Sequence, residues 1–227
     1  MVSLGRRGRL SNEHVARRAP PGAVDHLIYG VPDLEAGRDR IEELLGVRPV
    51  PGGRHPDYGT RNALVGLGSE TYLEIMAPDP ELPPPEDGVL FGLDVRRDAR
   101  FVTWALRSEA IEERAAEAAS HGLALGRVES GSRETPDGTV LGWKLTDPRA
   151  LPLGGVVPFL IAWGETPHPA ASVPRAGELA ALRLEHPDPD AVRAALAALG
   201  VEAEVAGGPA ARIVATIRTA RGDVEIA

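Results

Sequence analysis

The sequence predicts an α+β fold made of tandem βαβββ units, and three observations support this prediction. First, strand-like apolar runs are followed by short amphipathic helical patterns three times along the 227 residues. Second, the glycines that end these helical patterns, Gly46, Gly122 and Gly200, lie 76 and 78 residues apart. Third, 26 glycines and 21 prolines indicate many turns between short elements. A single α+β domain with accidental periodicity is the alternative.

The first unit reads as a strand, a helix and then further strands. The run "VDHLIYGV" (24–31) is a strand, and Asp33 is a typical N-cap for the helix that follows. Apolar residues recur at helical spacing until Gly46 ends the helix: Leu34, Gly37, Ile41, Leu44 and Leu45. The runs "RNALVGLG" and "TYLEIMAP" then flank a tight turn at 68–70, which predicts a pair of strands.

The second and third units repeat this plan. Their first strands are 101–107 and 178–187, and their helices are capped by Ser108 and by either Asp188 or Asp190. In the third unit the runs "ARIVATIRTA" and "DVEIA" supply the closing strands. We therefore expect a core of two paired units over residues 23–165 and a third, half-sized βαβββ-like unit over residues 178–227, with Pro-rich linkers between units.

Composition limits the classes of function. A net charge of −8 and a pI near 5.3 argue against nucleic-acid binding, which needs a concentrated basic face, so a small molecule is the expected partner. With no cysteine, any metal must be held by His, Asp or Glu. No apolar run reaches the roughly 20 residues of a spanning helix, so we expect no membrane association and a cytoplasmic protein. Residues 1–22 hold five arginines and one acid and are expected to form a flexible basic arm.

Two phrases of the first unit resemble a known family. The opening "VDHLIYGVPDLEAG" and the closing "GTRNALVGLGSETYLEIMAPDP" are similar to the vicinal oxygen chelate superfamily, in particular its glyoxalase-like domain proteins. The resemblance is close over residues 24–80 and extends to the second unit in plan only. It implies that two βαβββ units pair to form a cupped half-barrel sheet with a divalent metal in the cup. The implied ligands are a His on the first strand and a Glu on the last strand of each unit.

His26 and Glu74 match both ligand positions in the first unit. Side chains alternate between the faces of a strand, so these two converge if both of their faces line the cup. The resemblance thus predicts that His26 and Glu74 hold a metal and that Glu74 is also catalytic. His55 in "PGGRHPDYG" lies 29 residues after His26 in the same unit and is a candidate for a third ligand. Such donors suit Zn, Mn, Fe or Ni. The alternatives are a hydrogen-bonded His26 within the sheet and a His55 that serves only its turn.

The second unit departs from the family pattern. Laid on the first, it has Trp104 at the His position and an apolar residue at the Glu position, so the metal loses two of its four expected ligands. Trp104 is then expected to face the cup and contact a substrate. Arg54 and Arg61 flank the His55 segment and are candidates to bind a substrate carboxylate through the guanidinium fork. For both arginines a solvated surface position is the alternative.

These expectations lead to one principal function and one rival. The principal function is a metal-dependent lyase, isomerase or oxygenase that acts on a small oxygenated organic molecule. The rival is a non-catalytic protein that binds or sequesters a small molecule in a metal-free cup, which the missing second-unit ligands favour. The third unit is a further open point, because its role is either structural or in the assembly of a homodimer.

Overall fold

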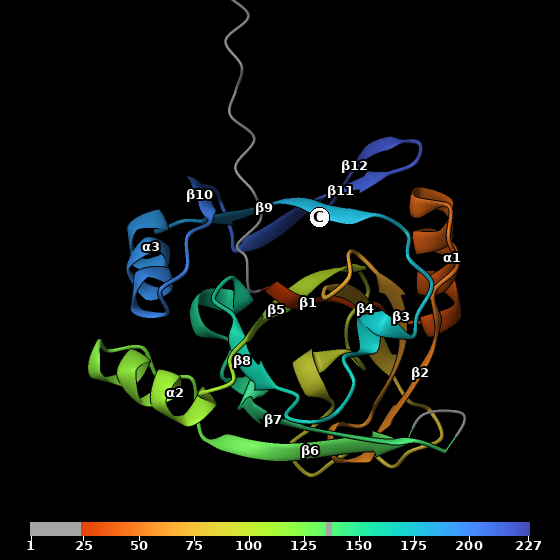
Figure 1. Ribbon diagram of the computed structural model, residues 1–227, viewed down its shortest axis with the longest axis horizontal. Helices are drawn as coiled ribbons and strands as arrows, with labels where there is room; N and C mark the ends of the chain where they lie inside the picture. The colour runs from red at the N-terminus through yellow and green to blue at the C-terminus, as the bar shows by residue number, and fades with distance from the viewer. Residues whose placement is uncertain (1–23, 135–137) are drawn as a thin grey trace, which may run out of the picture.

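The computed structural model describes residues 24–134 and 138–227, and the predicted basic arm (1–22) lies outside them. Over these ranges the chain forms an eight-stranded sheet, a four-stranded sheet and three α-helices (Figure 1). The predicted α+β fold class is therefore confirmed. None of the described helices combines the length and the apolar character needed to cross a membrane.

The first unit follows the predicted order. Its elements are β1 (Val24–Gly30), α1 (Leu34–Leu45), β2 (Val50–His55), β3 (Thr60–Gly66) and β4 (Tyr72–Pro78). Asp33 caps α1 as expected, because its carboxylate accepts a 2.8 Å hydrogen bond from the Ala36 amide. Gly46 ends α1 at φ +77°, a left-handed conformation that glycine adopts without steric penalty.

The second unit has the same order of elements. They are β5 (Arg100–Arg107), α2 (Ile111–Ser120), β6 (Val128–Glu134), β7 (Val140–Thr146) and β8 (Phe159–Ala162). The predicted cap at Ser108 is wrong, because α2 begins after Ala110 and has no side-chain cap. The Ser108 amide instead donates to the Ile161 carbonyl at 2.9 Å and so continues the pairing of β5 with β8. Short 3-10 turns complete the two units: Pro56–Tyr58, Leu90–Gly92, Pro148–Ala150, Pro152–Gly155 and Pro169–Ala171.

The eight strands of the two units form one sheet in the order β2-β3-β4-β1-β5-β8-β7-β6. Each unit pairs its first strand in parallel with its last, and the two first strands, β1 and β5, meet antiparallel at the centre. The edge strands β2 and β6 also come into contact, and the Arg133 side chain donates to the Gly52 carbonyl across this seam. The sheet is therefore more closed than the predicted half-barrel.

The third unit shares the order of elements but not the order of strands. Its elements are β9 (Glu178–His186), α3 (Pro189–Ala198), β10 (Glu204–Gly207), β11 (Arg212–Thr219) and β12 (Gly222–Ile226). They form a separate sheet in the order β10-β9-β11-β12. Here β9 pairs in parallel with β10, the strand directly after the helix, because the short link from α3 returns the chain beside β9. In the first unit the parallel partner is the last strand instead.

Two apolar clusters lie on the two faces of the large sheet. The larger cluster joins the outer face of that sheet to the helices and to the third unit, so that Leu27 and Leu106 share one core with Leu184 and Ala215. The smaller cluster lies on the inner face and includes Ile28, Met76 and Phe159. The helices and the third unit therefore cover the outside of the barrel, and the inner face is left to form a pocket (Figure 1).

Candidate functional site

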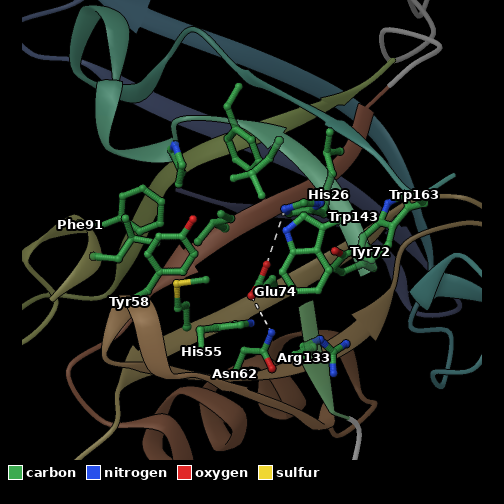
Figure 2. Close-up of a pocket in the computed structure, with 17 residues that line it drawn as sticks. His26, His55, Tyr58, Asn62, Tyr72, Glu74, Phe91, Arg133, Trp143 and Trp163 are labelled. Carbon is green, nitrogen blue, oxygen red and sulfur yellow. Dashed lines mark hydrogen bonds and ion pairs between the residues drawn. The ribbon is translucent and has the colours of Figure 1, made fainter. Parts of the chain in front are cut away.

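The inner face encloses a pocket with an empty volume of about 530 Å³, part of which is open to solvent. Apolar and aromatic side chains provide most of its wall, among them Tyr58, Phe91, Trp143 and Phe159. Polar groups gather in one region of the wall, and Figure 2 shows His26, Glu74 and Asn62 there in a row. A concave pocket that is mostly apolar, with a few convergent polar groups, is typical of small-molecule sites.

Strand register brings His26 and Glu74 together. Strands β1 and β4 run parallel, with His26 beside Tyr72 and Ile28 beside Glu74, so the two ionisable side chains project from adjacent strands into the same space. The His26 Nε2 atom lies 3.6 Å from Glu74 Oε2. The His26 ring also stacks on Tyr72, with 4.7 Å between ring centroids, which fixes its orientation. The predicted convergence of His26 and Glu74 is therefore present.

A bulge in β1 adds Asp25 to this site. Strict alternation would turn Asp25 away from His26, but the register with β5 shifts between Val24, which faces Leu106, and His26, which faces Ala105. Asp25 is thus an extra residue with no cross-strand partner, and a bulge of this kind re-aims a side chain. Its Oδ1 lies 2.8 Å from His26 Nδ1.

Asp25 is fully buried and is surrounded by hydrogen-bond donors. Its Oδ2 lies 3.1 Å from Arg107 Nε, from His168 Nε2 and from Trp163 Nε1. Burial acts to raise the pKa of Asp25, but the hydrogen bonds from His168 and His26 outweigh it, and the pKa falls well below its ordinary value. Asp25 is therefore an ionised acceptor at neutral pH.

The ionised Asp25 determines the tautomer of a neutral His26. Because Asp25 accepts at Nδ1, the proton sits on Nδ1 and the lone pair sits on Nε2, which faces the Glu74 carboxylate. The other Glu74 oxygen, Oε1, accepts a 2.6 Å hydrogen bond from Asn62 Nδ2. Two acceptors on buried side chains thus converge 3.6 Å apart, and a proton, a hydrogen-bond donor or a cation between them would satisfy both.

His55 lines the same pocket but is held apart from this pair. Its Nδ1 lies 3.1 Å from Thr60 Oγ1, and its ring meets the Trp143 ring edge-on. Burial lowers the pKa of His55, so the ring is neutral at pH 7. Within residues 24–134 and 138–227, no three His, Cys, Asp or Glu side chains are grouped closely enough to hold one metal ion. The predicted metal role of His55 therefore stays a prediction.

Trp104 lies on the opposite face from the one predicted. It is fully buried in the outer core, and its Nε1 donates a 2.8 Å hydrogen bond to the Val156 carbonyl. The reason is the register of β1 with β5. Trp104 lies opposite Leu27, and His26 lies opposite Ala105. Because directly opposed residues of an antiparallel pair point to the same side of the sheet, Trp104 points to the side of Leu27 and away from that of His26. Trp104 is therefore a core residue and does not line the pocket, so its contact with a substrate stays a prediction.

The two predicted substrate arginines do not line the pocket either. Arg54 is nearly half exposed and pairs with Asp79, with 2.9 Å between Nε and Oδ2, and with Glu81. Arg61 precedes Asn62 on β3, and since Asn62 points into the pocket, alternation turns Arg61 to the outer side. Both arginines lie near the predicted segment but on the wrong face.

Four residues of the site were missed by sequence reasoning. Asp25 was signalled only by its place beside His26, and Asn62 by a polar side chain at an inward position of a strand. His168 reads as linker sequence, yet the turn at Pro169–Ala171 brings it against Asp25. Arg133 reaches the pocket from β6, and no local spacing indicates that contact.

Comparisons with known proteins place this geometry in a family. A family model described as a glyoxalase-like domain matches residues 24–200. A hypothetical protein from Staphylococcus aureus is 14% identical, with a TM-score of 0.63 over 88% of this chain and 96% of that one, which shows the fold.

Two enzymes are more distant in structure. Methylmalonyl-CoA epimerase from Mycobacterium tuberculosis is 22% identical, with a TM-score of 0.43 over 66% of this chain and 94% of that one. The Streptomyces coelicolor enzyme in complex with 2-nitronate-propionyl-CoA is 18% identical, with a TM-score of 0.43 over 62% and 96%. No curated protein matches the sequence. Because the family model spans most of the chain and agrees with the resemblance seen in the first unit, this protein belongs to the glyoxalase-like domain family.

Proposed function

We propose that this protein is an enzyme that moves a proton on a small oxygenated organic molecule, as an isomerase or a lyase. One observation carries the proposal: His26 Nε2 and Glu74 Oε2 converge at 3.6 Å in the polar region of a mostly apolar pocket, with Asp25 holding the far side of the imidazole. Paired acid–base groups in a concave site are the usual machinery of proton transfer.

The chemistry follows from the tautomer of His26. A carbon–hydrogen bond next to a carbonyl group breaks, its proton goes to Nε2, and its electron pair moves into the carbonyl to give an enolate. The imidazolium formed is stabilised by Asp25 at 2.8 Å and by Glu74. Return of the proton to a different position or face gives an isomer, and departure of a group beyond the enolate gives a lyase reaction.

The metal that the family resemblance implies does not fit the donor set as it stands. A stable transition-metal site takes three or four protein ligands, whereas here two donors converge and no group of three exists among the described residues. The buried guanidinium of Arg133 lines the same pocket and adds positive charge. We therefore derive no step through a metal, and the role of His26, Glu74 and His55 as ligands stays a prediction for titration to test.

A non-catalytic binding protein is the second candidate, and the aromatic wall favours it. Tyr58, Phe91, Trp143 and Trp163 line the pocket and offer stacking surface for a flat ligand. Such a protein would bind the same small molecules and leave them unchanged. The two candidates therefore differ in one measurable property, which is turnover.

Proton exchange distinguishes the two candidates directly. Loss of the ¹H NMR signal next to the carbonyl is followed in D₂O for a panel of aryl ketones, 2-oxo acids and 2-methyl thioesters, with and without protein. We expect exchange above background for at least one compound class and a loss of about 10²–10⁴-fold in His26→Gln. The matched control is His121→Gln, which changes an exposed histidine at the end of α2. Binding without exchange across the whole panel would favour the non-catalytic candidate.

A further inference from the structure

Arg133 is a buried cation in the pocket wall that lacks a carboxylate partner within the described part of the chain. The residue is 7% exposed, lines the pocket and is bonded through its side chain to the Gly52 carbonyl. No ion pair joins it to a side chain of residues 24–133 or 138–227. The other arginine held close to the site differs, because Arg107 pairs with Asp25 at 3.1 Å.

A guanidinium in this position is suited to bind an anionic ligand. It carries five N–H donors in a rigid fork, and Nη1 donates to the Gly52 carbonyl. Burying a charge without an opposite charge is unfavourable, so the position is best satisfied when a ligand supplies an anion.

We propose that the substrate is a small organic monocarboxylate with an apolar or aromatic body. This inference rests on the proposed function, because it assigns the substrate class of the same pocket. The carboxylate binds the Arg133 fork, and the body lies against apolar and aromatic side chains such as Ile28, Phe91 and Trp143.

Charge in the pocket distinguishes a carboxylate from a phosphate. Arg133 is the one arginine or lysine among the pocket residues and forms no ion pair with Glu74, so a ligand with one negative charge matches the guanidinium, whereas the second charge of a dianion would add repulsion from Glu74. The same repulsion orients the ligand. Its anionic end lies at Arg133 and away from Glu74, which leaves a carbon of the body to approach His26 Nε2.

Tryptophan fluorescence provides a binding assay, since Trp143 and Trp163 line the pocket. The probes are phenylacetate, 3-phenylpropionate and 4-phenylbutyrate, each compared with its own neutral amide, which has the same shape. We expect the best acid to bind about 10 to 100 times more tightly than its amide, the range of a charge-assisted bidentate pair. Arg133→Gln should remove this preference, and Arg133→Lys should retain part of it.

Arg54→Gln is the matched control, because it removes an exposed arginine that lies outside the pocket, and the acid preference should persist. Near-ultraviolet circular dichroism verifies that each variant is folded. If Arg133→Gln fails to fold, the wild-type comparison of acid with amide and the Arg133→Lys variant still decide the matter. A wild type that binds no acid better than its amide overturns the substrate class, as does a preference that survives in folded Arg133→Gln.

The outcome is separable from that of the proposed function. Acids that bind through Arg133 but show no proton exchange support the substrate class and refute the enzymatic proposal. Exchange that is equally fast on neutral ketones and on 2-oxo acids, and that is insensitive to Arg133→Gln, supports the enzyme and overturns the substrate class.

Discussion

Replacement of Asp25 by asparagine removes the charge on which the site depends and leaves the shape of the side chain almost unchanged. In the native protein one fully buried carboxylate serves Arg107, His168, Trp163 and His26 together. An amide keeps one acceptor oxygen but replaces the other with an NH₂ group, which is a donor. At least one of the four neighbouring donors would therefore face an N–H group in place of an acceptor. Asp25→Asn therefore tests the stability and the chemistry of the site in one variant.

The expected loss of stability follows from the burial of the pair. Removal of one partner of a buried ion pair costs about 3–5 kcal/mol because the other charge stays uncompensated. The Arg107 side chain is 24% exposed and keeps some hydration, and the asparagine oxygen retains one hydrogen bond. We therefore expect a loss near the lower end, about 3 kcal/mol in the free energy of unfolding at pH 7.

The dependence on pH has a defined sign. The pKa of Asp25 is lower in the folded protein than in the unfolded chain, where an aspartate titrates near 3.9, so its contribution is complete above about pH 4 and declines as the pH falls below that value. The difference in stability between wild type and Asp25→Asn should therefore be constant from pH 5 to 8 and should narrow in more acidic solution.

Urea unfolding followed by circular dichroism measures these free energies. Glu70→Gln is the matched control, because Glu70 is an exposed partner of the same Arg107 at 3.4 Å and an exposed pair is worth about 0–1 kcal/mol. Proton exchange in D₂O should fall about 10²–10⁴-fold in Asp25→Asn, because His26 is no longer held with its proton on Nδ1. A loss of stability below about 1 kcal/mol, or a difference that does not narrow in acid, would refute the account of Asp25 as a buried ionised acceptor.

Three further predictions concern the metal, His55 and Trp104. Titration of the wild type with Mn, Fe, Ni and Zn, followed by calorimetry, should show at most weak binding, because two donors converge. His26→Gln and Glu74→Gln should each abolish that binding. Tight stoichiometric binding would show that His55 or another group completes a metal centre. Burial lowers the pKa of His55, so the unfolded chain takes up a proton first and the free energy of unfolding should fall as the pH drops below about 6.5. His55→Gln should reduce that slope, measured by urea unfolding, by up to about 1.4 kcal/mol per pH unit, and His121→Gln should not. Trp104→Ala should lose about 3–5 kcal/mol of stability because it empties a fully buried core position, and ligand affinity in the fluorescence assay should be unchanged; a selective loss of affinity would return Trp104 to the pocket.

Local signals were sufficient for the first unit. The N-cap at Asp33 and the terminating Gly46 act within one helical turn, and both function as the sequence predicts. His26 and Glu74 were found through the family resemblance, strand alternation indicated that they could converge, and the structure brings the two together. The family resemblance rests on the same segment and is confirmed.

Long-range features could not be derived in this way. A bulge between Val24 and His26 changes which side Asp25 faces, and a shift of one residue in the assumed register of β5 put Trp104 on the wrong face. His168 and Arg133 reach the site from segments more than 100 residues from His26, through contacts that depend on the closed sheet. The strand order of the third unit likewise depends on which neighbour β9 finds, and the element order alone does not specify it.

The position of the third unit has a consequence for folding during synthesis on the ribosome. Residues 24–163 emerge before residues 178–227 and contain all eight strands of the large sheet, but outer-face side chains such as Leu27 share their apolar core with Leu184 and Ala215, which are made later. Until β9 and β11 are synthesised and pack against it, the outer face of the nascent barrel exposes apolar surface of the kind that chaperones recognise. A message truncated before residue 178 would therefore yield a chain with its strands in place and its exterior unprotected, which would be cleared or would aggregate.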